Sequence, residues 1–168
     1  MSVLVSASSR HGSTMEIAHL IVGILADRGI EAEVREPDDV TTLDGVDAIV
    51  LGSGVYMGRW LEPAKAFVER FAPAFSTRRV WLYSSGPLGD PAKPEVDPVD
   101  AAAMMETTHA LDHRVFPGRL VASELGLGER LIVKGVRAPY GDFRPWPEIT
   151  DWVEGIAADL AASPVATA

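Results

Sequence analysis

Short apolar segments alternate along this chain with segments whose apolar residues recur every three or four positions. The apolar segments have the length of strands and lie at residues 2–7, 32–36, 47–52, 79–84 and 113–120. The helical pattern occupies residues 13–28, 61–71, 100–108 and 147–161. Strands that alternate with helices form a parallel sheet with helices on both of its faces. The pattern therefore predicts an α/β fold, a three-layer, doubly wound, parallel five-stranded sheet.

One segment breaks this alternation. Residues 121–146 lie between the fifth predicted strand and the last predicted helix, with an amphipathic piece at 129–136 and a loop at 138–146 that is rich in aromatic residues and proline. A chain of 168 residues fits one domain. We therefore expect residues 1–168 to form a single domain with an extra segment at 121–146 and a frayed tail at 162–168.

Composition narrows the function classes. The formal net charge is −9, which disfavours binding to nucleic acid or to an anionic membrane and would suit a basic protein partner or solubility alone. The chain contains no cysteine, which excludes disulfides, thiolate metal sites and cysteine nucleophiles. No apolar run approaches the length of a membrane span, and no signal peptide is visible. The expectation is a cytoplasmic protein without an integral membrane segment.

The link between the first strand and the first helix has the composition of a phosphate site. It reads Ser8-Ser9-Arg10-His11-Gly12-Ser13-Thr14. A helix N-terminus offers free backbone N–H groups and a favourable dipole to an anion, and the hydroxyls and Gly12 allow close contact. Ser and Thr are also ordinary helix caps, so capping alone is the alternative. The Rossmann and Walker glycine motifs are absent, so hydroxyls and amides would hold the phosphate without a P-loop lysine.

Three predicted loops at the same edge of the sheet share a composition. The loops after the first, third and fourth strands, at residues 8–13, 53–60 and 84–90, are all rich in Gly and Ser. In doubly wound sheets, ligands bind beyond the carboxyl ends of the strands, where the strand order reverses. Three small-residue loops there indicate a flat ligand with a phosphate tail.

These residues resemble the flavodoxin family. Ser9, Gly12, Thr14, Ala18 and Ile21 fit the flavodoxin signature, and the departure is Ala7, where an aromatic residue is usual. Within the family, the chain looks most like the flavodoxin-domain group that includes menaquinone-dependent protoporphyrinogen IX dehydrogenase. The first loop, the Gly- and aromatic-containing segment 52–60 and the extra segment carry that likeness. The resemblance implies a flavodoxin-like fold with strand order 2-1-3-4-5.

The resemblance also implies FMN as the cofactor and assigns residues to it. The phosphate would be wrapped by Ser9, Arg10, His11, Gly12, Ser13 and Thr14. The isoalloxazine ring would be lined by Ser53, Gly54, Val55, Tyr56, Met57 and Gly58, with Tyr56 or Trp60 packed on it. Its pyrimidine edge would meet backbone groups of Ser84, Ser85, Gly86 and Gly89. Gly58 matches the glycine whose carbonyl turns toward flavin N5 on reduction, a turn that a residue without Cβ permits.

Two functions follow from this likeness. The first is an FMN-dependent oxidoreductase that passes electrons between an organic substrate and a quinone or partner protein, with the flavin supplying the chemistry. The extra segment would then border the substrate through Tyr140, Phe143 and Trp146, and the arginines available for an anionic substrate are Arg59, Arg137 and Arg144. The alternative is a non-enzymatic electron carrier that docks a basic reductase, which the charge of −9 favours.

Other functions fit the residues less well. His109 and His113 are spaced like a metal pair but have no third ligand near them in the sequence, so no metal site is expected. A phosphoacceptor receiver domain would need an aspartate where the third strand ends in Leu51-Gly52-Ser53. The oligomeric state is open, and a homodimer is compatible with the sequence.

Overall fold

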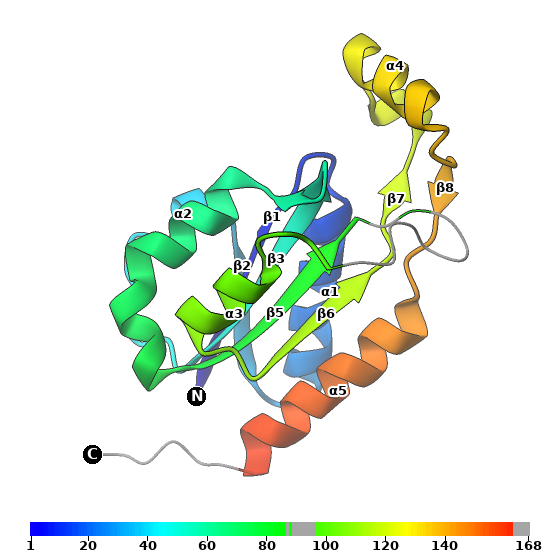
Figure 1. The fold of residues 1–168 in the computed structure, drawn as a ribbon. Coiled ribbons are helices and arrows are strands. Elements are labelled where there is room, and N and C mark those ends of the chain that lie inside the picture. Colours follow the sequence, from blue (N-terminus) through cyan, green and yellow to red (C-terminus); the bar gives the residue numbers. More distant parts are fainter. Residues whose placement is uncertain (87, 89–96, 163–168) are drawn as a thin grey trace.

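The computed structural model describes residues 1–86, 88 and 97–162, and its centre is a mostly parallel sheet (Figure 1). The parallel strands follow the order β2-β1-β3-β5-β6. Their bounds are β1 Ser2–Ser8, β2 Glu31–Arg35, β3 Ala48–Tyr56, β5 Arg79–Ser85 and β6 Asp112–Phe116. The predicted fold class and strand order are thus confirmed. Gly89 and residues 163–168 of the predicted tail lie outside the described residues.

Helices cover both faces of the sheet (Figure 1). On one face lie α1 (Ser13–Asp27) and α5 (Trp146–Ala162), and on the other lie α2 (Glu62–Phe71) and α3 (Ala101–Thr108). Short 3-10 turns, η1 Pro37–Asp39 and η2 Ala72–Thr77, complete the connections. The central strand β3 alternates between the two cores, which explains its continuous apolar run.

The predicted loop at residues 53–60 is instead a β-ribbon. Strand β3 runs on to Tyr56 and turns through Met57 and Gly58 into β4 (Arg59–Trp60), which pairs antiparallel with it. Both turn residues have positive φ, 51° and 75°, as a tight two-residue hairpin requires. The small residues of this stretch give no hydrophobic pattern, so the sequence did not predict that β3 continues here. The pairing of β3 with β5 nevertheless continues through Gly54.

The fifth predicted strand is also shorter than its apolar pattern. Strand β6 ends at Phe116, and Pro117-Gly118 redirects the chain into β7 (Arg119–Leu120), which pairs antiparallel with β8 (Gly141–Asp142). Between them lie η3 (Ala122–Glu124) and α4 (Leu127–Val136).

We call residues 117–145 the arm and the other residues the body. The arm contains most of the segment that broke the sequence pattern, and it projects beyond the carboxyl ends of the parallel strands (Figure 1). Among the described residues, no helix has the length and apolar character needed to cross a bilayer.

Candidate functional site

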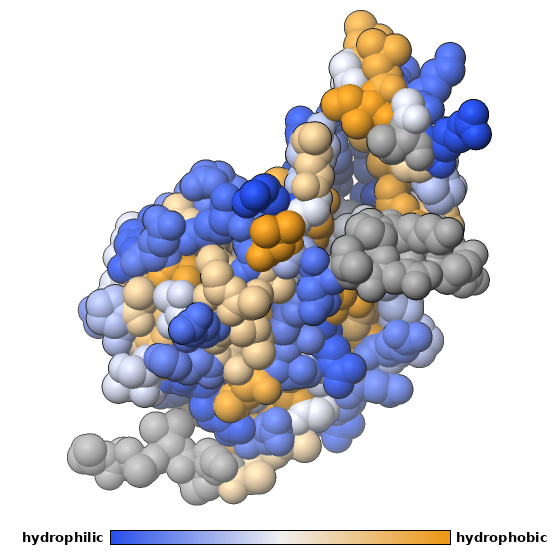
Figure 2. Space-filling model, in the orientation of Figure 1, coloured by the Kyte–Doolittle hydropathy of each residue, from blue (hydrophilic) through white to orange (hydrophobic). Residues whose placement is uncertain are grey.

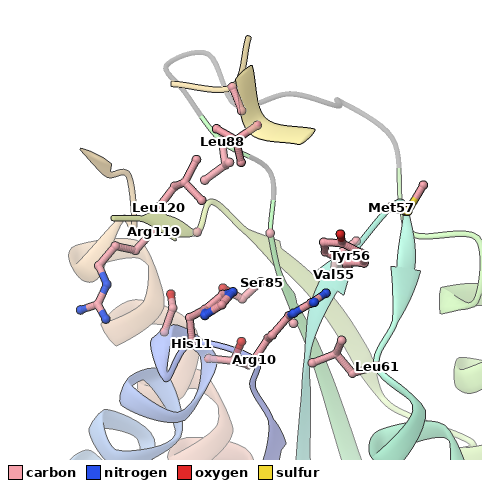
Figure 3. A pocket seen from close by; sticks show the side chains of 18 of the residues that line it. Arg10, His11, Val55, Tyr56, Met57, Leu61, Ser85, Leu88, Arg119 and Leu120 are labelled. Carbon is pink, nitrogen blue, oxygen red and sulfur yellow. The ribbon is translucent and has the colours of Figure 1, made fainter. Parts of the chain in front are cut away.

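A cavity of about 1110 Å³ lies at the carboxyl ends of the strands, between the body and the arm (Figure 3). Its walls come from the loop after β1, the β3–β4 ribbon, the end of β5 and the arm. The structure brings together these sequence-predicted residues on its walls: Ser9, Arg10, His11, Ser13, Thr14, Gly54, Val55, Tyr56, Met57, Gly58, Ser85 and Gly86.

The loop after β1 is shaped to receive an anion. Gly12 adopts φ +80° as the N-cap of α1, a conformation that favours glycine, and α1 then begins at Ser13. Ser9 Oγ accepts a hydrogen bond from the Thr14 backbone N–H at 3.2 Å, so the capping alternative is realised in part. Ser13 Oγ is buried and has no hydrogen-bond partner among the described residues. Buried hydroxyls normally have a partner, so Ser13 Oγ, which faces the cavity, is free to donate to a ligand there.

A carboxylate from the arm already binds this loop. Glu129 on α4 lies 2.7 Å from Arg10 Nε and 3.2 Å from His11 Nε2. Its other oxygen accepts the Gly126 backbone N–H at 2.9 Å. This backbone hydrogen bond, with the nearby charges of His11 and Arg10, lowers the pKa of Glu129, so the group is ionised at neutral pH. The two side chains that the sequence assigned to a phosphate therefore both contact the Glu129 carboxylate.

An aromatic face borders the same space. The Arg10 guanidinium lies 4.3 Å from the centroid of the Tyr56 ring, a cation–π contact, and Figure 3 shows Arg10 extending from the loop toward that ring. Tyr56 thus presents its ring to the cavity and accepts a flat cationic group there. A flat aromatic ligand would use the same face.

Two glycines at the base of the cavity allow neighbouring backbone segments to approach closely. A Cβ on Gly54 would lie 3.2 Å from Thr14 Oγ1, and one on Gly86 would lie 2.7 Å from Val55 Cβ. Tyr83 adds support from below, because its hydroxyl donates to the Thr14 carbonyl at 3.1 Å, and burial raises its pKa. The loop, the ribbon and the end of β5 can therefore lie close together, and a ligand would meet their backbone.

Four predicted residues lie behind the cavity wall. The structure corrects the interpretation of Trp60, which was expected in a loop as one of two candidates to pack on the ring. Its side chain is 3 % exposed and its Nε1 donates to Ser84 Oγ at 2.8 Å. Ser53 is fully buried too, and its Oγ accepts the Leu61 backbone N–H at 2.9 Å. With Gly12, these side chains shape the wall without lining it.

The Gly58 peptide is already engaged. Its carbonyl accepts the Val99 backbone N–H at 2.9 Å. A rotation of this peptide, as the family resemblance implies, would break that hydrogen bond. This hydrogen bond therefore holds the Gly58 peptide in one orientation, and the predicted turn of its carbonyl toward flavin N5 would need a second one.

The arm supplies an apolar wall opposite the loop. It consists of Leu120, Leu125, Ile132, Val133, Pro139 and Phe143, with Arg137 at the rim. Of the residues predicted to border a substrate, Phe143 and Arg137 line the cavity, whereas Tyr140, Trp146 and Arg59 do not. Arg144 is also elsewhere: it is buried and bound to Asp142 and Glu16, both at 2.7 Å.

The comparisons agree with this geometry. The chain matches the family model of the flavodoxin domain over residues 4–144. The protein belongs to the flavodoxin domain family. No curated protein sequence matches the chain. FMN, the cofactor that the resemblance implied, is confirmed as the cofactor of this family. The protein is thus a flavodoxin-like domain of a flavin-binding, electron-transferring family.

Solved structures show the same fold at low sequence identity. A flavodoxin from Streptococcus pneumoniae has 19 % identity and a TM-score of 0.63, covering 96 % of this chain and 99 % of its own. The rubredoxin oxygen:oxidoreductase of Desulfovibrio gigas has 10 % identity and a TM-score of 0.66 over 96 % of this chain. The flavodiiron protein of Giardia intestinalis has 12 % identity and a TM-score of 0.59 over 96 % of this chain. This flavodoxin-like chain spans only 36 % and 35 % of the last two proteins.

Sequence reasoning missed Glu129 as a site residue. A signal was present, because Gly126 and Glu129 have the spacing of an N-cap and an N3 acid, which marks a helix start. That spacing predicts the capping contact to Gly126, but nothing local predicts that the same carboxylate reaches a loop 118 residues earlier.

Proposed function

We propose that this flavodoxin-like protein is an FMN-dependent oxidoreductase that passes electrons between an organic substrate, held against the arm, and a quinone or a protein partner. When bound, FMN supplies the electron-accepting and electron-donating chemistry. The overall reaction would be similar to that of menaquinone-dependent protoporphyrinogen IX dehydrogenase.

The roles of the chain's own residues follow from their positions. Ser9, Ser13 and the N-terminal amides of α1 would donate to the phosphate, with Arg10 and His11 adding charge-assisted hydrogen bonds. Tyr56 would pack on the ring. Backbone groups of Ser85 and Gly86, at the end of β5, would meet the ring edge.

The observation that carries the proposal is the two-sided cavity. One side has hydroxyls and cations for a phosphate, and the other is the apolar wall of the arm. At about 1110 Å³ the cavity exceeds the roughly 300–1,000 Å³ typical of a site for one drug-sized ligand. It therefore has room for an apolar molecule beside the cofactor. Arg137 at the rim would favour a substrate that carries an anionic group.

Charge favours a second candidate, an electron carrier without a substrate of its own. The arm contains five Arg or Lys and three Asp or Glu, a net charge of +2, so the body carries −11. An acidic body of this kind would steer a basic reductase toward the protein.

Reduction kinetics separate the two functions. Anaerobic, FMN-loaded protein is mixed either with protoporphyrinogen, with menaquinone as acceptor, or with a flavodoxin reductase and NADPH, and flavin absorbance is followed. The proposal expects reduction by the organic substrate. Phe143→Ala should slow it about tenfold, because the variant loses apolar contact with the substrate, whereas Tyr140→Ala, on the arm but outside the cavity wall, should leave it unchanged. Reduction by the reductase alone would reject the enzyme in favour of the carrier.

A further inference from the structure

Most of the exposed large apolar side chains lie at the end of the molecule that contains the cavity. Eight large apolar side chains are exposed among the described residues. Met1 and Leu111 precede β1 and β6, at the amino ends of the strands. The other six lie on the arm, on the β3–β4 turn or just before α3: Met57, Val99, Leu127, Leu131, Ile132 and Tyr140. Figure 2 shows this apolar surface over the projecting α4. Contiguous exposed apolar patches mark interaction surfaces, whereas singly scattered apolar residues are ordinary.

Helix α4 has an apolar stripe that the cavity does not use. Glu129, Ile132 and Val133 line the cavity. Leu127 and Leu131 are one helical turn apart on another side of α4, are 82 % and 72 % exposed, and do not line the cavity. These two leucines therefore have no function in the proposed flavin or substrate site.

Cations without acidic partners border this stripe. Arg130, Lys134 and Arg137 recur along α4 and its C-cap at spacings of four and three residues. Within the described part of the chain, no carboxylate lies within 4 Å of any of the three. The other two basic side chains of the arm, Arg119 and Arg144, are paired with acids. The net charge of −9 is thus the sum of a cationic arm, at +2, and an acidic body, at −11.

We propose that α4 is a docking surface for an anionic lipid bilayer. Leu127 and Leu131 would enter the boundary between headgroups and acyl chains, and Arg130, Lys134 and Arg137 would contact lipid phosphates. A helix with an apolar stripe flanked by Lys and Arg lies in the plane of such an interface without spanning it. Since the Debye length is only about 8 Å at physiological salt, the projecting arm meets the surface while the acidic body stays in solution.

The charges disfavour a second copy of the chain as the occupant. A symmetric dimer through α4 would bring two copies of the same cationic patch together, because a twofold interface joins identical patches. An anionic bilayer presents the opposite charge over the whole face. Docking would also turn the cavity mouth toward the lipid, although the lipid contact itself stands independently of the proposed reaction.

Vesicle flotation tests the proposal. The full-length protein, loaded with FMN, is floated with vesicles of phosphatidylcholine alone or of phosphatidylcholine with phosphatidylglycerol. We expect flotation with the anionic vesicles, weakened by added salt. Leu127→Gln with Leu131→Gln should reduce partitioning at least tenfold. Lys134→Gln should reduce it about fivefold on anionic vesicles only. Leu111→Gln is the matched control, since Leu111 is 57 % exposed at the opposite end of the sheet, and it should change nothing.

Three results would overturn the proposal. These are absence of wild-type protein from the floated anionic vesicles, equal flotation of the double leucine variant, and equal loss in Leu111→Gln. Light scattering adds a fourth: a wild-type dimer that the double leucine variant converts to a monomer would assign the surface to a second copy. The leucines are exposed, so unchanged near-ultraviolet circular dichroism is expected in every variant.

Discussion

The body and the arm of this flavodoxin-like protein are stabilised by different interactions. In the body, two apolar cores lie on the two faces of the sheet and contain most of the buried side chains. In the arm, Leu125 is the one buried apolar side chain among the described residues. Ion pairs instead fix the arm: Glu16 on α1 binds Arg119 and Arg144 from it, and Glu129 on the arm binds Arg10.

Because the arm is held mainly by ion pairs, cofactor binding should affect its position. Segments with few buried apolar contacts open at low free energy, whereas core strands open only with the whole domain. The contacts of the arm end on α1 and on the loop after β1, the two elements that would hold the phosphate. The position of the arm should therefore respond to the cofactor, while the sheet should not.

The largest expected effect is in the body. Phe67 on α2 is fully buried, and Phe67→Ala should lower the free energy of unfolding by about 3–5 kcal/mol because it leaves a cavity. Leu131→Ala in the arm should change it by less than about 0.5 kcal/mol. Urea denaturation measures both. Similar losses for the two variants would mean that body and arm share one core.

Arg144 tests the ionic attachment of the arm. Its guanidinium lies 2.7 Å from both Asp142 and Glu16, and its hydrogen bond lowers the pKa of Asp142. Arg144→Met should cost about 2 kcal/mol and raise hydrogen exchange in the arm well before the sheet. Arg114→Met removes a more exposed pair on the body and serves as the control. Unchanged exchange in the arm would contradict the ionic attachment.

Glu129→Gln should affect the cofactor more than the fold. Glu129 contacts Arg10 and His11, which are assigned to the phosphate, and would compete with it for them. Removal of the Glu129 charge should therefore tighten FMN binding about fivefold, measured by quenching of flavin fluorescence. Gln still caps α4. The control is Glu124→Gln, whose carboxylate pairs with Arg119. Weaker binding in Glu129→Gln would mean that the carboxylate positions Arg10 for the phosphate and does not compete with it.

The smallest expected effect is a titration in the body. Burial lowers the pKa of His113, against the opposing charges of Asp97 and Asp112. The stability from neutral His113 is therefore complete above its unfolded pKa of about 6.5 and is lost as pH falls through the lower folded value. The free energy of unfolding should decline by less than about 1 kcal/mol below pH 6.5, and His113→Gln should abolish this part. If the decline in the free energy of unfolding persists in His113→Gln but disappears in His109→Gln, it belongs to His109, and its assignment to His113 is wrong.

The fold was predictable where burial dictates the pattern. The apolar run of β3 and the helical spacing of α1 follow from contact with the two cores, so the layers could be derived from the pattern, whereas the strand order came from the family resemblance. The glycine turn into α1 was predictable because the positive φ of Gly12 is a local requirement, and the assignment of this loop to a phosphate stays a prediction. The ribbon at Tyr56–Arg59 was not, because small residues carry no hydrophobic period.

Side-chain contacts between segments that are distant in the chain could not be predicted from the sequence. An indole in a small-residue segment looks exposed, yet Trp60 finds a hydrogen-bond partner on β5 and packs inward. Arg144 likewise looks available to a substrate but is bound to a glutamate 128 residues earlier. Such pairings depend on which elements become neighbours, and no local pattern encodes that.

The most direct test of the phosphate site is FMN titration of Ser13→Ala beside Ser6→Ala. Both hydroxyls are buried without a partner among the described residues, but only Ser13 lines the cavity. If the phosphate is the missing partner of Ser13 Oγ, Ser13→Ala should weaken FMN binding about tenfold without lowering the stability of the cofactor-free protein, and Ser6→Ala should leave FMN affinity unchanged. Equal FMN affinity in Ser13→Ala and wild type would contradict the site.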